Sequence, residues 1–347
     1  MEMRFLGRSG LHVSVLGFGV MTFGDGAGQS NWRFKAISST GLADATRQVG
    51  LCLDTGVNLF DTADIYAAGQ SEEILGKALG PRRKDVVVAT KAFARMGERA
   101  HDIGLSRRHL IEACDDSLRR LGSDWIDLYQ VHSFDALVPL EETLAALDQL
   151  VASGKVRYIG CSNYAGWQLM KALGISDRLG LERFVGQQIQ YSLMARDAED
   201  ELLPCGVDQG VGALIWSPLA SGFLSGKFRS ERSGDSRLEK TGRIAAYDNP
   251  HADGVLDAVL AIAGARGVSA SQVSLNWLRA RPGVTSILVG ARTDAQLADN
   301  LAAASWSLTA EEVATLDRAS QTAVRYPNSH HRQHSLERNP QLFARYE

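Results

Sequence analysis

The sequence predicts an α/β fold: a single (β/α)8 TIM barrel with an N-terminal β-hairpin and long loops at its C-terminal face. Eight short apolar runs alternate with helical patterns along the 347 residues, as expected for strands joined by right-handed crossovers. The runs are continuously rich in Val, Ile and Leu, which is typical of strands covered on both faces. No break in composition divides the chain, and this favours a closed barrel over a doubly wound sheet.

The elements can be assigned in order along the chain. A short hairpin around residues 7–10 opens the sequence. The eight strand candidates that follow are residues 14–19, 57–60, 86–90, 126–131, 157–160, 184–190, 213–216 and 285–290. We expect each to be followed by a helix that covers the outside of the barrel.

Helix boundaries are marked by residues that cap or terminate helices. Ser106 can cap a helix that ends at Gly122, and Pro139 stands near the start of a helix that ends before Gly154. Thr293 is the expected cap of the last helix of the alternating pattern.

Two stretches depart from the strand–helix alternation. Residues 221–253 are rich in Gly, Ser and charge, and residues 322–347 are polar and aromatic without a clean helical period. Long irregular segments in compact domains tend to be binding loops or disordered pieces. We therefore interpret residues 1–347 as one domain, with 322–347 as a tail on the substrate side of the barrel mouth.

Composition argues against several classes of partner. A formal net charge of −3 gives no reason to expect nucleic acid or an anionic membrane, and no apolar run approaches the roughly 20 residues that span a bilayer. The N-terminus lacks the pattern of a signal peptide. The four cysteines are dispersed without CxxC spacing, which suits reduced thiols in the cytoplasm.

Four polar residues stand where successive predicted strands end. Asp61 closes one strand, Lys91 and His132 directly follow the next two, and Tyr66 lies just beyond Asp61. The carboxyl ends of parallel barrel strands meet at one mouth, where barrel enzymes carry out their chemistry. Each residue alone has a plain structural explanation, such as a helix cap, a packed loop, a solvated amine or a core histidine. Their joint placement favours a site for proton transfer.

The proposed proton donor is the phenol of Tyr66. A free phenol has a pKa near ~10, too high for efficient proton donation at neutral pH. A nearby ammonium such as Lys91 stabilises the phenolate and lowers that pKa. Asp61 then supplies the charge that makes a buried Lys91 tolerable, and His132 offers a hydrogen bond to a carbonyl oxygen.

Two other kinds of site are weaker interpretations. Gly17 and Gly19 begin a dinucleotide fingerprint, but Gly24 comes two positions late and no helical pattern starts there. Asp61, Asp64 and His132 are possible metal ligands, yet the later strands end in hydroxyls, amides and an indole rather than in further ligands. Those groups suit a ligand that contains an amide and a flat ring, and we expect no metal.

The sequence resembles the aldo-keto reductase superfamily over essentially its whole length, in particular a bacterial branch related to potassium-channel β subunits. The resemblance is carried by GVNLFDTADIYAAGQSEEILGKAL (56–79), VVVATK (86–91), IDLYQVH (126–132), GKVRYIGCSNY (154–164), WSPLASGFLSGK (216–227) and GARTDAQLADN (290–300). It implies a barrel that binds NADP(H) in an extended pose across its mouth and transfers a hydride between the nicotinamide and a carbonyl carbon.

The resemblance also implies roles for individual residues. Tyr66 would be the general acid, assisted by Lys91 and Asp61, and His132 would orient the carbonyl. The positions that match the cofactor site are Gly19, Met21 and Asp61; Ser162, Asn163 and Gln188 for the carboxamide; Trp216 for stacking on the nicotinamide; Ser217, Leu219, Gly222 and Lys227 for the pyrophosphate; and Gly290, Arg292, Gln296 and Asn300 for the adenosine and its 2′-phosphate.

Together these features predict an NADP(H)-dependent reductase of aldehydes or ketones, or a dehydrogenase of the corresponding alcohols. Its partner would be a small carbonyl or alcohol, with neither nucleic acid nor membrane involved. The alternative is a cofactor-binding regulatory subunit of the channel-β type with little turnover. Substrate identity, the physiological direction and the oligomeric state stay open at this stage.

Overall fold

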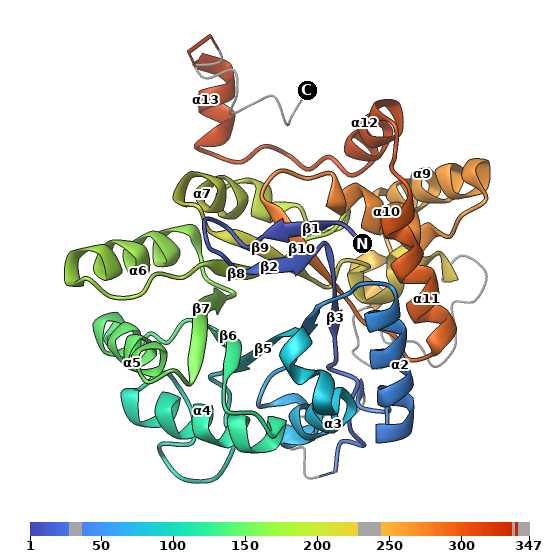
Figure 1. The fold of residues 1–347 in the computed structure, drawn as a ribbon. Helices are drawn as coiled ribbons and strands as arrows, with labels where there is room; N and C mark the ends of the chain where they lie inside the picture. The colour runs from blue at the N-terminus through green and yellow to red at the C-terminus, as the bar shows by residue number, and fades with distance from the viewer. Residues whose placement is uncertain (28–36, 228–243, 335–336, 339–347) are drawn as a thin grey trace.

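The computed structural model describes residues 1–27, 37–227, 244–334 and 337–338 of the chain. Eight parallel strands form a closed barrel in the order β10-β3-β4-β5-β6-β7-β8-β9, with helices around it (Figure 1). The strands are β3 (Leu16–Gly19), β4 (Leu59–Asp61), β5 (Val87–Ala92), β6 (Ile126–Val131), β7 (Val156–Ser162), β8 (Gly186–Gln190), β9 (Gly212–Trp216) and β10 (Val284–Val289). The predicted (β/α)8 barrel is confirmed, and each of the eight strands overlaps its predicted range.

Helices cover the outside of the barrel, and most of the barrel strands are followed in the chain by such a helix. They are α2 (Leu42–Asp54), α3 (Gln70–Leu79), α4 (Arg107–Leu121), α5 (Leu140–Ala152), α6 (Gly166–Leu179), α7 (Leu202–Gln209), α9 (Pro250–Arg266), α10 (Ala270–Arg279), α11 (Asp294–Ala302), α12 (Ala310–Ala319) and α13 (Asn328–His334). Among the described residues no single helix is long and apolar enough to cross a membrane; α9 and α10 meet that test only as a pair, with a bend of 103° between them.

The expected helix caps are present. The Ser106 side chain accepts a hydrogen bond from the backbone N–H of His109 at the start of α4, and Gly122 ends that helix in the left-handed region at φ 60°. Thr293 caps α11 by accepting from the N–H of Gln296. These local interactions satisfy backbone groups that a helix leaves unpaired at its ends.

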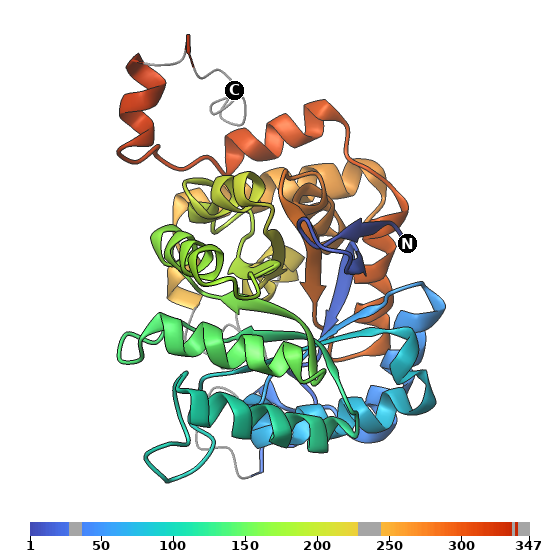
Figure 2. The ribbon, with the colours of Figure 1, turned by 60° about the vertical axis from the view of Figure 1, so that its left-hand side comes forward.

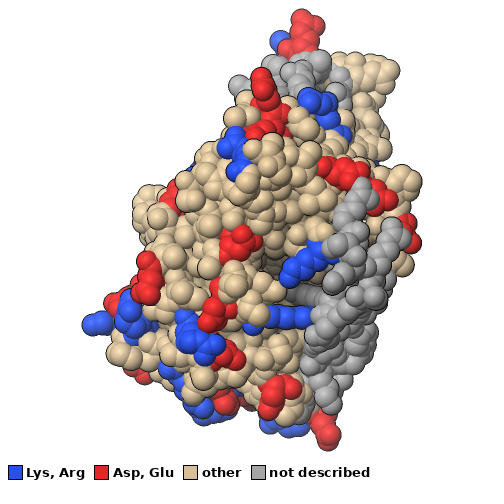
Figure 3. Space-filling model, turned by 90° about the vertical axis from the view of Figure 1, so that its right-hand side faces the viewer, with Lys and Arg blue, Asp and Glu red and all other residues tan. Residues whose placement is uncertain are grey.

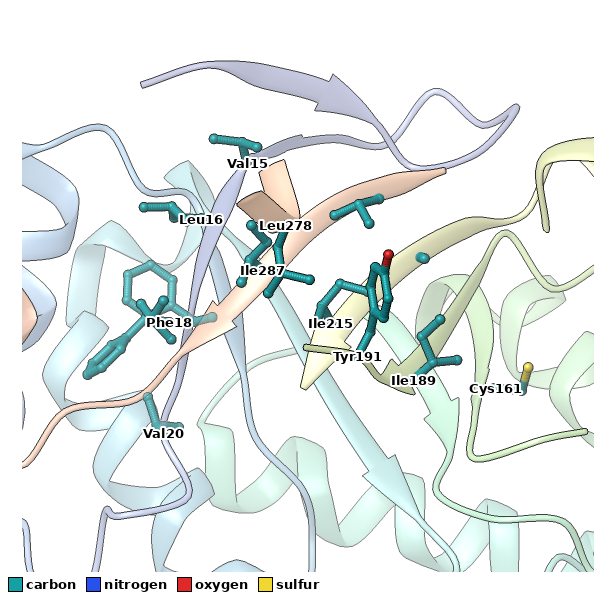
Figure 4. Packing of buried hydrophobic residues seen from close by; sticks show 14 of the residues in the cluster. Val15, Leu16, Phe18, Val20, Cys161, Ile189, Tyr191, Ile215, Leu278 and Ile287 are labelled. Carbon is teal, nitrogen blue, oxygen red and sulfur yellow. The ribbon is translucent and has the colours of Figure 1, made fainter. Parts of the chain in front are cut away.

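Alternation along the strands separates two apolar layers. Ala213 and Ile215 of β9 point outward and join the cluster that packs under the helices, whereas Leu214 points into the barrel. Figure 4 shows part of the outer layer, in which Ile287 of β10 lies beside Leu278 of α10. Because successive side chains of a strand face opposite sides, strands buried on both faces need the continuous apolar runs from which they were predicted.

An N-terminal hairpin closes the bottom of the barrel. Strands β1 (Met3–Phe5) and β2 (His12–Ser14) pair antiparallel, as the sequence predicts. Leu6, Leu11 and Val13 are buried against the inward-facing side chains of the barrel strands. This apolar floor leaves the opposite end, where the strands finish, for polar side chains.

We expect Gly7→Ala to destabilise the protein by about 2 kcal/mol or more, from overpacking and a left-handed backbone combined. Gly7 has φ 59°, and an added Cβ would overlap the carbonyl oxygen of Gly210. Gly10 lies in the same hairpin, and its Cβ would only touch the Tyr158 hydroxyl at 3.4 Å. Denaturant unfolding of both variants tests the argument, and equal stability of Gly7→Ala and Gly10→Ala would contradict it.

The structure differs from the sequence-based expectations at three places. Lys91 lies inside β5, which continues to Ala92, instead of following the strand. Within 221–253, the described part contains short 3-10 helices at Ala220–Ser225 and Ile244–Tyr247 and the start of α9, while residues 228–243 lie outside the described residues. The tail forms the short helix α13, although its sequence shows no clean helical period.

The position of the tail relative to the substrate stays a prediction. Figures 1 and 2 show α13 standing apart from the barrel. The tail contacts the segment after β8, where Arg325 pairs with Asp197 at 2.9 Å and the Asn328 amide donates to the carbonyl of Asp200. The last nine residues, 339–347, lie outside the described part.

Candidate active site

Asp61 and Lys91 form a buried ion pair at the end of the barrel where the strands finish. The Lys91 ammonium donates to Asp61 Oδ1 at 2.6 Å and to the backbone carbonyl of Thr62 at 2.7 Å, and its side chain is fully buried. Burial opposes the charged form. The charge of Asp61 and the hydroxyl of Tyr66 outweigh that effect, so the pKa of Lys91 is raised above its ordinary value. The amine is therefore a cation at neutral pH.

Tyr66 lies next to this cation. Lys91 Nζ is 5.3 Å from the centre of the Tyr66 ring, and the Tyr66 hydroxyl is one of the groups hydrogen-bonded to the ammonium. Tyr66 is buried against a small apolar cluster that includes Met21 and Met96. The arrangement puts a positive charge beside a phenol that faces an apolar surrounding, as the sequence analysis expects.

His132 completes the group of four. Its ring lies edge-on to that of Tyr66, with 5.9 Å between centres. Burial, together with the positive charge of Lys91, lowers the pKa of His132 to about 3. The imidazole is thus neutral near pH 7 and has one N–H to donate, which suits a hydrogen bond to a carbonyl oxygen. The structure brings together all four residues that the sequence singled out.

Two buried glutamines orient Asp61. The amide of Gln188 donates to Asp61 Oδ2 at 2.7 Å, and that of Gln130 donates to the same oxygen at 3.3 Å. The sequence analysis missed Gln130. The signal is an amide inside the apolar run IDLYQV, at the position that pairs with Lys91 in the sheet register. Its inward direction follows from its spacing of two residues from Leu128, which lines the barrel interior.

A second group of predicted residues lies beside His132. Asn163 donates to the carbonyl of His132 and to Ser162 Oγ, both at 3.0 Å, and accepts from the indole N–H of Trp216 at 3.2 Å. Ser162 in turn donates to the backbone carbonyl of Gln188. Asn163 has φ 57°, a conformation that asparagine tolerates better than most residues. These hydrogen bonds fix the Asn163 amide and the Trp216 indole at the edge of the barrel mouth.

The segment after β9 turns tightly through left-handed conformations. Ser217, Ala220 and Ser221 have positive φ although none is glycine, and Gly222 has φ 98°. The N–H of Gly222 donates to the carbonyl of Leu219. Such strain tends to accumulate at binding sites. Lys227 is the last described residue before the undescribed segment 228–243.

A third group lies at the start of α11. The side-chain oxygen of Gln296 accepts from the backbone N–H of Arg292, and the Asn300 amide donates to the carbonyl of Gly290. Gly290 stands beside β3, since an added Cβ would lie 3.6 Å from the carbonyl oxygen of Gly19. On the face that carries α2 and α11, basic side chains lie at the edge of a hollow (Figure 3).

Alternative chemistries find little support in the described residues. Within the parts of the chain that the structure describes, no three His, Cys, Asp or Glu side chains are grouped to hold a metal ion. All four cysteines are free thiols, and three of them are buried. Burial raises the pKa values of Cys52 and Cys161, so neither thiol is a ready nucleophile.

The structure thus gathers a buried lysine–aspartate ion pair, a tyrosine and a neutral histidine at the end of the barrel where the strands finish. The chain belongs to the aldo/keto reductase family, whose sequence model matches residues 15–321. This agrees with the resemblance seen in the sequence.

Similar proteins include both enzymes and channel subunits. The chain is 37% identical over 326 residues to the "Uncharacterized oxidoreductase YrpG" of Bacillus subtilis, covering 90% of this chain and 93% of that protein. It is 34% identical over 343 residues to the "Versiconal hemiacetal acetate reductase" of Aspergillus parasiticus, covering 91% and 96%. It is also 36% identical over 316 residues to the "Probable voltage-gated potassium channel subunit beta" of Arabidopsis thaliana, covering 87% and 91%.

Proposed function

We propose that the protein is an NADP(H)-dependent oxidoreductase that interconverts an aldehyde or ketone and the corresponding alcohol. The observation that carries the proposal is the contact of Lys91 with both Asp61 and Tyr66. A fixed ammonium lowers the pKa of a neighbouring phenol, so that the phenol can exchange its proton near neutral pH. Family membership and the named oxidoreductases among the relatives support the same reaction class.

The residues present fit a nicotinamide dinucleotide. Because Gln188 uses its amide N–H₂ on Asp61, its side-chain oxygen would accept from a carboxamide. Ser162 and Asn163 are bonded to each other, and Ser162 is bonded to the Gln188 backbone, so they would lie next to the same group. Trp216 offers a flat face held by Asn163. The turn from Ser217 to Gly222 and the start of α11 would hold the phosphates. When bound, the cofactor supplies or accepts the hydride.

The chain's own residues supply the proton and the orientation. In the reducing direction the Tyr66 hydroxyl gives its proton to the carbonyl oxygen as negative charge develops there. Lys91 stabilises the phenolate left behind, and Asp61 keeps Lys91 in place. The neutral His132 donates its N–H to the same carbonyl oxygen, an electrostatic contribution that is typically among the largest in such sites.

A steady-state assay of NADPH oxidation with a panel of aldehydes and ketones tests the proposal. Turnover that depends on the carbonyl and saturates with both reactants supports it. One observation favours a second function, a cofactor-binding regulatory subunit: the 36% identity to plant proteins named as channel β subunits. Tight NADPH binding without oxidation across the panel, and without reduction of NADP⁺ by the matching alcohols, would favour that second function.

We expect Arg292→Ala to weaken NADPH binding about tenfold or more and to leave NADH binding nearly unchanged. A 2′-phosphate at the start of α11 would meet the helix N-terminus and the guanidinium, and charge-assisted bonds of this kind are the stronger class. Fluorescence titration with both cofactors measures the two dissociation constants. Equal losses for NADPH and NADH would mean that the phosphate is held elsewhere.

A further inference from the structure

The backbone around Tyr66 is held in an unfavourable conformation. Ala67, Ala68 and Gly69 have φ values of 49°, 55° and 97°, so three successive left-handed residues follow Tyr66. The left-handed region is unfavourable for residues that carry a Cβ, and strain of this kind persists only where the surroundings enforce it. Some feature outside the turn must therefore hold it in place.

Helix α3 begins directly after the turn and is fixed to the barrel by two buried side chains. Ser71 Oγ donates to the carbonyl of Val20 at 2.9 Å and contacts Thr62 Oγ1 at the same distance. The next residue, Glu72, is completely buried, and its Oε1 accepts from the hydroxyl of Thr90 at 2.5 Å. Thr90 is the residue before Lys91 on β5. Glu72 thus connects the segment that follows Tyr66 with the strand that carries Lys91.

Arg120 of α4 completes this connection from the outer layer of helices. Its Nε pairs with Glu72 Oε2 at 2.6 Å, which compensates the buried charge. The side chain of Arg120 also covers Gly69, because an added Cβ there would lie 2.7 Å from Arg120 Cδ. The Arg120 side chain therefore both pairs with Glu72 and packs against Gly69 at the end of the strained turn.

A second buried carboxyl group, that of Asp64, interacts with Glu72. Asp64 is also fully buried, and one of its carboxyl oxygens has no hydrogen-bond partner. Burial and the charge of Glu72 raise the pKa of Asp64 well above its ordinary value. This shift favours the neutral form of Asp64, whereas Glu72 is the carboxyl group that pairs directly with Arg120.

We propose that Thr90, Glu72 and Arg120 are positioning residues that hold the strained turn so that Tyr66 stays in contact with Lys91. None of the three touches the reacting groups, and the proposal rests on the function proposed above. Thr90 faces the helices because Lys91, its neighbour on the strand, faces the barrel interior. Through Glu72, Thr90 on the outer face of β5 thereby controls the distance between Tyr66 and Lys91, which lies on the inner face of the same strand.

The test is Thr90→Val, which removes the hydroxyl with little change of shape. We expect kcat to fall about tenfold or more, since small misplacements of a reacting group are costly, with KM for NADPH unchanged. We also expect the pKa of the Tyr66 phenol to rise by about one unit as its contact with the ammonium loosens. Carbon-13 NMR titration of labelled tyrosines measures that pKa, with the Tyr66→Phe variant assigning the signal.

Two further variants separate positioning from general destabilisation. Thr90→Ser keeps the hydroxyl and is expected to restore most of kcat and the wild-type Tyr66 pKa. Thr143→Val removes another buried hydroxyl, one on α5 that donates to the carbonyl of Leu105, and is expected to change neither quantity. A folded Thr90→Val protein with wild-type kcat and wild-type Tyr66 pKa would overturn the proposal.

The Tyr66 titration separates failure of this proposal from failure of the proposed function. If the wild-type protein turns over no carbonyl, the proposed function fails, while the Tyr66 titration still decides the positioning role. If Thr90→Val does not fold, Arg120→Lys serves instead, because it keeps the charge opposite Glu72 and loses the planar group. We expect it to raise the Tyr66 pKa in the same direction by a smaller amount, and an unchanged value would overturn the proposal.

Discussion

Replacing Tyr66 by phenylalanine is expected to reduce kcat about a thousandfold, within the range typical for loss of a general acid or base. The ring and its apolar contacts with Met21 and Met96 remain, so the affinity for NADPH should be nearly unchanged. Only the proton that neutralises the developing alkoxide is removed. Steady-state kinetics gives kcat, and quenching of tryptophan fluorescence gives the dissociation constant.

The chain offers a matched control for this substitution. Tyr164 is also buried near the barrel mouth, and its hydroxyl has no hydrogen-bond partner within the described structure. Tyr164→Phe should therefore keep the wild-type kcat and stability. If Tyr66→Phe turned over as fast as Tyr164→Phe, the proton would have to come from another group and the proposed mechanism would be wrong.

Lys91→Met is expected to abolish turnover and to lower the free energy of unfolding by about 3–5 kcal/mol, the usual effect of breaking a buried ion pair from one side. The Asp61 carboxylate would keep its bonds from Gln188 and Gln130 but would lose the cation 2.6 Å away. Its side chain is only 4% exposed, so water cannot replace the ammonium. Urea unfolding followed by circular dichroism measures the change.

The double variant Lys91→Met/Asp61→Asn separates the two consequences. Removing both charges should recover most of the lost stability, because no uncompensated carboxylate remains. Turnover should stay as low as in the single variant, since the phenol still lacks its cation. A double variant no more stable than Lys91→Met would show that the ion pair is not the source of the loss.

The barrel itself was predictable from the sequence because every strand is buried on both faces. Runs such as 86–90 and 126–131 contain few polar residues, and glycine or a capping residue marks the neighbouring helix ends at Ser106 and Gly122. Strand ends were less certain. Lys91 reads as the residue after a strand, yet β5 extends to Ala92, since a polar side chain facing the barrel mouth does not interrupt backbone pairing.

The four proposed catalytic residues were predictable for a similar reason. They lie at or near the carboxyl ends of apolar strands, and barrel topology alone brings such positions together. The roles of Glu72 and Arg120 were not predictable. Glu72 and Arg120 stand 48 residues apart on different helices, and their contact depends on how α3 packs against α4. Sequence spacing within either helix gives no sign of it.

The pairing of β3 with β10 has a consequence for how the chain is made. Leu16 lies opposite Ile287 in the sheet, and Arg4 donates to the carbonyl of Val284. Because β10 pairs with both β3 and β9, a chain growing on the ribosome has two unpaired strand edges until about residue 289 has emerged. Exposed edges invite pairing with other chains, so we expect the nascent protein to be most prone to aggregation before β10 has been made.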